Sequence, residues 1–304
     1  MIRPPKNRPL NPRRIGVIVM HTFTQLVRMK VFYFLGVFAV ILLASNLFNI
    51  QGIDRPDLEG TDVLRSIRSW SLGTMTLFSV VLGVVATALL LPKDVEDRTL
   101  YTILAKPVPR LDYLVGRLGG VLLLIFVSLL AMDLLMSGVL AIRTHFIVAN
   151  QVAAATQAGW PADEIAAMTE ATRSQGPTWS LHAASLAVFL RSAVISSCAL
   201  LLSTFSTSTL FTTITGLMVY FIGNFQAIAR EHFFSAGGSG VLERLAALVV
   251  ATIFPDFQIF NQIDRVIEGK TFPPDVLMNL CGLTAFYVVL HVLVSWLIFA
   301  GKEF

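Results

Sequence analysis

Residues 118–141 read LGGVLLLIFVSLLAMDLLMSGVLA, and this stretch decides the fold class. It contains one charged side chain, Asp133, and is longer than the roughly 20 residues that a helix needs to cross a bilayer. Of the whole chain, 55% of the residues are hydrophobic and 14% are charged, whereas soluble proteins carry about 25% charged residues. Because helices satisfy their own backbone groups inside lipid, the sequence predicts an all-α integral membrane protein.

Further apolar runs of similar length lie on both sides of this stretch. The six predicted transmembrane helices cover residues 31–50, 71–91, 118–141, 184–205, 208–228 and 276–300. Together they make residues 31–304 a single six-span transmembrane domain. Residues 1–30 are predicted to be a cytoplasmic tail followed by an amphipathic helix at the membrane interface. Asn11 and Pro12 are a typical helix start. The alternative is that this helix is a cytoplasmic extension of the first span.

The distribution of basic residues predicts the orientation of the chain. With the N-terminus inside, the inner segments hold 13 of the 23 Lys and Arg residues: seven in 1–30, five in 91–117, and Lys302. Basic residues favour the cytoplasmic side of a membrane. Both termini are therefore predicted to be cytoplasmic. The basic charge is read as contact with lipid headgroups and not with nucleic acid.

Two segments on the predicted outer side are not spans. The outer loop 142–182 is expected to contain a short helix from Asp163 to Thr172. Residues 241–254 are apolar but too short to cross the membrane, and Pro255 ends them. Residues 241–268 are therefore predicted to be a re-entrant or interfacial segment with a helical second arm. If residues 241–254 cross instead, the C-terminus lies outside.

The connector at 91–117, LPKDVEDRTLYTILAKPVPRLDYLVGR, is unusually polar for a link between two spans. Pro92 is expected to end the second span. Asp94, Glu96 and Asp97 would then begin a short helix, where carboxylates suit the positive end of the helix dipole. Two interpretations follow from the residues alone: an element that transmits a push from a partner, and an ordinary loop held at the lipid headgroups.

The run EDRTLYTILAKPVPR at 96–110, followed by YLVGR at 113–117, resembles the inner-loop signature of ABC-2 type permeases. It is most similar to the branch that includes the permease of the copper-enzyme (nitrous oxide reductase) maturation system. FPDFQIFN at 254–261 and IFAGKEF at 298–304 resemble the closing pattern of that family. Arg98 departs from the pattern, because many of these permeases have glycine there.

The resemblance implies a fold, a set of partners and a location. Two permease subunits would pair, as a homodimer or a related heterodimer, in a bacterial-type inner membrane. A coupling helix in each would dock on one of two separate ATPase subunits, which carry the ATP and Mg²⁺. The docking residues carried over are Glu96, Asp97, Arg98, Thr99 and Leu100, with Lys106, Pro107 and Arg110 holding the bend.

No nucleotide, metal or catalytic site is expected in the chain itself. Gly269-Lys270-Thr271 imitates the end of a phosphate-binding loop, but Asp264 stands where the motif requires its first glycine. His291 is interpreted as a neutral, hydrogen-bonded histidine in the last span. The predicted function is the membrane-spanning subunit of an ATP-driven exporter. The alternative is a stand-alone secondary carrier or a membrane scaffold.

Asp133 and Arg191 are the ionisable residues inside predicted spans, where a charge costs roughly 2.5–3.5 kcal/mol. Three interpretations stay open. The two side chains pair across their helices, Asp133 lines a substrate path or binds a cation, or each side chain reaches the headgroups independently. The first of these is the working hypothesis.

Overall fold

The structure is a computed structural model that describes residues 11–30, 32–33, 36–37, 40–41, 61–96, 109–206, 208–235 and 255–301, with only the backbone at 61, 91–96 and 227–235. These residues form helices and no strand. The elements are α1 (Pro12–Val27), α3 (Thr61–Glu96), α5 (Arg110–Gln157), α6 (Ala162–Ser174), α7 (Trp179–Phe205), α8 (Thr209–Ser235), the 3₁₀ helix η2 (Phe257–Phe260), α10 (Ile263–Ile267) and α11 (Pro274–Ala300). The all-α prediction is confirmed.

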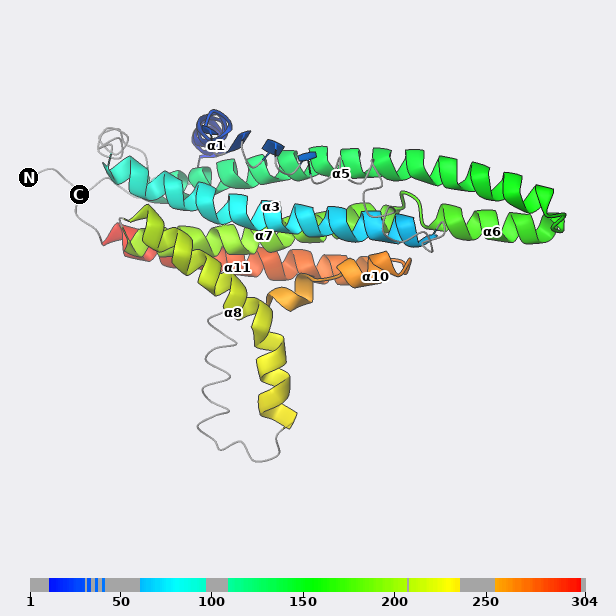
Figure 1. Cartoon of the computed structure of the whole chain (residues 1–304). Coiled ribbons are helices and arrows are strands. Elements are labelled where there is room, and N and C mark those ends of the chain that lie inside the picture. Colours follow the sequence, from blue (N-terminus) through cyan, green and yellow to red (C-terminus); the bar gives the residue numbers. More distant parts are fainter. Residues whose placement is uncertain are drawn as a thin grey trace, which may run out of the picture.

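Four long helices, α3, α5, α7 and α11, run side by side as a bundle (Figure 1). Within the described residues, four helical segments are long and apolar enough to cross a membrane: Asp62–Leu90, Arg110–Gln157, Ala162–Phe205 and Pro274–Ala300. The third of these includes α6 and α7. The chain therefore has the character of a membrane-embedded protein with four candidate spans.

α7 lies at the centre of the bundle and contacts α3, α5, α8 and α11. Small side chains allow this close packing, as they do in membrane helices generally. Ser192, Ser196 and Ser197 of α7 are fully buried. A Cβ atom added at Gly83 of α3 would lie 2.4 Å from Ser196 Oγ. The Ser196 hydroxyl group therefore occupies the space that a side chain at position 83 would need.

α1 packs across the first turns of α5, and its predicted start is confirmed. Asn11 caps the helix by accepting a hydrogen bond from the Arg13 backbone, and Pro12 is its first residue. Arg117 of α5 donates hydrogen bonds to Gln25 at 2.8 Å and to Thr22 at 3.3 Å. The N-terminal helix is thus attached to the bundle by polar contacts.

The second predicted span differs from the observed helix at its end. α3 continues through Pro92 to Glu96, so Pro92 does not end it. Asp94 and Glu96 consequently lie at the C-terminal end of α3 and not at the start of a new helix. Proline is tolerated inside long membrane helices when neighbouring groups satisfy the freed carbonyl, which the ordinary helix-breaking rule ignores.

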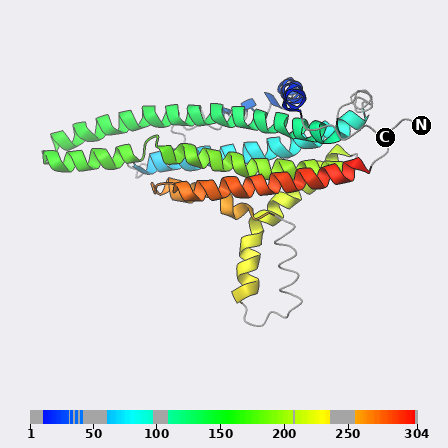
Figure 2. The same ribbon diagram turned by 180° about the vertical axis from the view of Figure 1, so that it is seen from behind.

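The outer loop predicted at 142–182 is mostly helix. α5 continues to Gln157, and residues 142–157 contain neither glycine nor proline to end it. The chain turns at Gly159, whose φ of 73° suits glycine. The short helix expected from Asp163 to Thr172 is confirmed as part of α6. Figure 2 shows α5 and α6 projecting together beyond the rest of the bundle.

The remaining predicted spans are only partly described. The first, 31–50, is described at a few residues, and 241–254 lies outside the described residues. α8 covers the fifth and runs back along α7, so that Gly216 packs near Ala199. It is not among the four candidate spans. The second arm of the predicted re-entrant segment is not one helix, because η2 and α10 are separated at Asn261–Gln262.

Candidate functional site

The described part of the connector lies at one end of the bundle. Arg110, the first residue of α5, donates hydrogen bonds to the carbonyl oxygens of Phe299 at 2.7 Å and Ala300 at 2.6 Å. Its guanidinium also lies over the Phe299 ring, 5.9 Å from the centroid. A cation at a helix C-terminus is favourable because carbonyl groups there lack partners. The start of α5 is thereby joined to the end of α11.

The other predicted docking residues are less fully placed. Glu96 is the last residue of α3, described by its backbone. The rest lie outside the described residues: Asp97, Arg98, Thr99, Leu100, Lys106 and Pro107.

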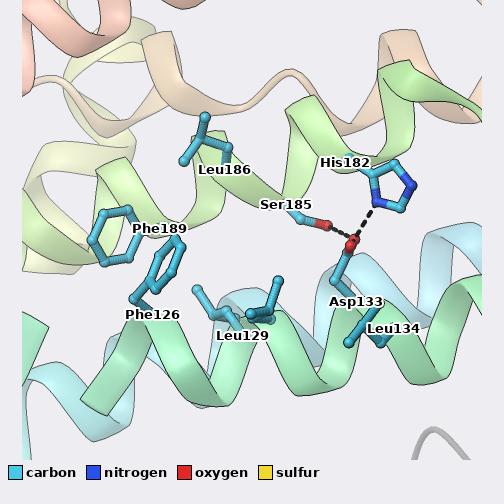
Figure 3. A pocket seen from close by; sticks show the side chains of 9 residues that line it. Phe126, Leu129, Asp133, Leu134, His182, Ser185, Leu186 and Phe189 are labelled. Atoms are coloured by element: carbon cyan, nitrogen blue, oxygen red, sulfur yellow. Dashed lines mark hydrogen bonds and ion pairs between the residues drawn. The ribbon is translucent and has the colours of Figure 1, made fainter. Parts of the chain in front are cut away.

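Asp133 lies on α5 and faces α7, where it forms a compact polar cluster (Figure 3). Its Oδ2 atom is 2.6 Å from His182 Nδ1, and its Oδ1 atom accepts a hydrogen bond of 2.5 Å from Ser185 Oγ. Bonds this short are typical of an ionised acceptor. His182 and Ser185 are three residues apart on α7, so one face of that helix supplies both donors.

The Asp133 cluster lies at one end of a cavity of about 260 Å³ between α5 and α7. The other lining side chains are apolar: Phe126, Leu129, Leu130, Leu134, Leu186 and Phe189. The Asp133 side chain is 8% exposed and the His182 side chain is 40% exposed. The cavity therefore combines a buried carboxylate, an accessible imidazole and hydrophobic walls.

The cluster contains Ser, His and Asp but is not arranged for nucleophilic catalysis. In a catalytic triad the histidine bonds to the serine and the carboxylate orients the histidine. Here Ser185 and His182 both bond to Asp133, and Ser185 Oγ also lies 3.2 Å from the Leu181 carbonyl oxygen. His182 is therefore not in place to accept the hydroxyl proton of Ser185 as the histidine of a triad does.

Arg191 lies further along α7 and faces α8. Its guanidinium donates a hydrogen bond to Asn224 Oδ1 and lies over the Tyr220 ring, 5.0 Å from the centroid. Asn224 in turn donates to the Tyr220 carbonyl oxygen at 2.8 Å. The residue is 6% exposed, and its described partners are a neutral amide and an aromatic ring.

The expected ion pair between Asp133 and Arg191 is not found. Asp133 bonds to His182 and Ser185 on the side of α7 that faces α5, whereas Arg191 bonds to Asn224 on the side that faces α8. Both helices were identified correctly, but similar depth in the membrane does not place two side chains on facing surfaces. Sequence position alone could not decide which helix each side chain faces.

This separation makes a test of additivity possible. Asp133→Asn and Arg191→Gln are expected to change the free energy of unfolding additively, within about 0.5 kcal/mol, because they share no partner. The control pair, Arg191→Gln with Asn224→Ala, should be non-additive because those two side chains bond to each other. Thermal unfolding of the purified variants compares the destabilisation of each double variant with the sum of its two single variants. Strong coupling between Asp133 and Arg191 would contradict the observed partners.

His182 and Ser185 were not recognised from the sequence as functional residues. His182 is the last residue of the predicted outer loop, 142–182, where a polar side chain is ordinary. The signal that could have found both is their three-residue spacing at the start of an apolar helix. His291, in contrast, lies 2.8 Å from Ser197 Oγ, as expected of a hydrogen-bonded histidine. Among the described residues, no three His, Cys, Asp or Glu side chains are grouped to hold a metal ion.

Comparisons with known proteins do not assign the chain. No protein-family model matches it, and no curated protein matches it either.

Proposed function

We propose that this chain is the membrane-spanning permease subunit of an ATP-driven exporter of the ABC-2 type. Two such subunits would work with two copies of a separate ATPase, which supplies the ATP and Mg²⁺ chemistry. The observation that carries the proposal is the polar run at 96–110, whose residues resemble the ATPase-docking signature of that family.

The placement of this run supports the proposal. It connects α3 to α5, and Arg110 at its end is hydrogen-bonded to the last residues of α11. A force applied to the run would therefore act on several long helices together. The C-terminal end of α11 lies at the same end of the bundle, which agrees with our proposal that this end faces the cytoplasm of a bacterial-type cell.

The test is co-purification of the permease with its ATPase. Glu96→Lys is expected to reduce the co-purified ATPase about tenfold or more, which corresponds to a loss of about 1.4 kcal/mol of binding. The reason is that reversing a charge in a docking surface places like charges together. Affinity purification of the tagged chain from its native membrane, followed by identification of Walker-motif proteins, measures this loss.

The matched control is Glu164→Lys on α6. This residue is exposed and lies in the projecting hairpin, away from the connector. It should leave the amount of co-purified ATPase unchanged. If the wild-type chain brings down no ATPase, or if both variants behave alike, the proposal is wrong.

A secondary carrier remains the second candidate, favoured by one observation. The buried Asp133 and its His182 partner form the kind of intramembrane titratable pair that proton-driven transport uses. Transport that continues without any ATPase but stops when the proton gradient is collapsed would favour the carrier.

A further inference from the structure

We propose that the cavity between α5 and α7 binds an amphipathic organic cation, with its positive group beside Asp133 and its apolar body against the leucine and phenylalanine walls. Such a ligand would be the substrate class of the proposed transporter. The interpretation of the cavity as a transport site rests on that proposed function. Binding itself can be measured without the ATPase.

The cavity has the dimensions and lining of a small-molecule site. Its volume of about 260 Å³ lies just below the range for ligand pockets, roughly 300–1,000 Å³, so it suits a small ligand. Such sites are mostly apolar, with a few polar groups that orient the ligand. Here the polar groups are gathered at one end, as Figure 3 shows, and the ring pair Phe126–Phe189 lies at the other.

The polar end favours a positive ligand. Among the described residues, Asp133 is the only carboxylate lining the cavity, and its residue is 6% exposed. Its Oδ2 atom lies 2.6 Å from His182 Nδ1, and its Oδ1 atom accepts a hydrogen bond of 2.5 Å from Ser185 Oγ. A carboxylate in a site from which water is largely excluded attracts a nearby cation strongly.

The apolar side chains that line the cavity favour an apolar body for the rest of the ligand. Phe126 and Phe189 are packed edge to face, with ring centroids 5.3 Å apart, and they form an apolar end for the body of the ligand. Leu130 and Leu134, which line the cavity, are 48% and 62% exposed. Both lie on α5, a candidate membrane span, so an amphipathic molecule dissolved in the membrane would meet the cavity directly.

Two other occupants fit the site less well. An anionic amphiphile would bring its charge to the Asp133 carboxylate, and the nearby Arg191 cannot compensate because it faces α8. A neutral alkyl chain would pack against the apolar walls but would have no electrostatic attraction to Asp133. The effect of head-group charge on binding therefore distinguishes a cation site from a cavity that any lipid chain can occupy.

The experiment compares three probes that share one alkyl chain: decyltrimethylammonium, decanol and decanoate. Radiolabelled probes are equilibrated with the full-length protein in nanodiscs of uncharged lipid, and empty nanodiscs correct for partition into lipid. Decyltrimethylammonium is expected to bind saturably at one site per chain, about tenfold or more tightly than decanoate. Equal saturable binding of all three probes would overturn the proposal.

Three variants localise the binding. Asp133→Asn, which keeps the size of the side chain, should remove the preference for the cation. Leu130→Trp should fill the cavity and abolish saturable binding of every probe. Asp275→Asn removes an exposed carboxylate at the start of α11, outside the cavity, and should change nothing. Wild-type affinity for the cation in Asp133→Asn would show that the site is elsewhere.

The two proposals fail independently of each other. A cation preference without a co-purified ATPase would leave the site standing and reject the ATP-driven function. A co-purified ATPase without any cation preference would support the ATP-driven function and reject the cation site.

Discussion

Replacing Gly120 by alanine is expected to loosen α1 from α5 and to destabilise the protein by about 1–3 kcal/mol, the usual effect of overpacking a close contact. A Cβ atom at this position would lie 2.5 Å from Thr22 Cβ and 2.9 Å from the Val19 carbonyl oxygen. The second of these neighbours is backbone and cannot move away by changing rotamer. The whole of α1 must therefore shift.

The control for this substitution is Gly138→Ala on the same helix, where an added Cβ atom meets nothing within 4 Å. Alanine is the better helix former by up to about 1 kcal/mol, so this variant should be slightly stabilised. Thermal unfolding gives the two opposite signs, and protease sensitivity of α1 should rise in Gly120→Ala alone. Equal effects of the two substitutions would mean that α1 does not pack as observed.

Replacing Arg68 by methionine is expected to destabilise the protein by about 3 kcal/mol or more, since hydrogen bonds from charged groups contribute about 1.5–3 kcal/mol each. Arg68 of α3 is fully buried. It donates hydrogen bonds to the carbonyl oxygens of Gln175 at 2.9 Å, Val266 at 2.8 Å and Ser174 at 3.5 Å. Two of these groups end α6 and the third belongs to α10, so one side chain joins three elements.

Arg65→Met is the matched control for Arg68→Met. Arg65 lies three residues earlier on α3, is half exposed and is 3.8 Å from Asp62. Exposed ion pairs of this kind contribute about 0–1 kcal/mol, so this variant should unfold almost as the wild type does. Proteolysis between α6 and α7 provides a local measurement, because Arg68→Met should expose that link. Similar unfolding of both variants would show that the buried hydrogen bonds are unimportant.

The fold could be predicted where hydrophobic length decides the structure. The cores of α3, α5, α7 and α11 follow from apolar runs that exceed the bilayer thickness. Helix ends were less predictable, because Pro92 lies inside α3 and residues 142–157 extend α5. In both places a local rule, that proline breaks helices or that polar segments are loops, was overridden by continuity with a long helix.

The site could be predicted only in part, for a different physical reason. Asp133 and Arg191 are conspicuous because a charge inside an apolar span requires an explanation. Their partners depend on the direction in which each helix faces, and no periodicity in the very apolar α5 and α7 indicates that direction. The contact between His182 and Asp133 therefore becomes visible only once α7 is packed on α5. Arg68 was likewise overlooked, since its carbonyl partners come from Ser174, Gln175 and Val266, far away in the sequence.

The length of α5 has a mechanical consequence. Its 48 residues rise by about 72 Å, which is more than twice the roughly 30 Å of the hydrocarbon core. The base of this helix is held at Arg110 by the carbonyl oxygens of α11, so a rigid tilt of α5 about its base would be largest at the far tip. A tilt of about 5° at the base would displace the far tip by roughly 6 Å over that rise. The hairpin with α6 would thus move farther than any other part of α5 in such a tilt.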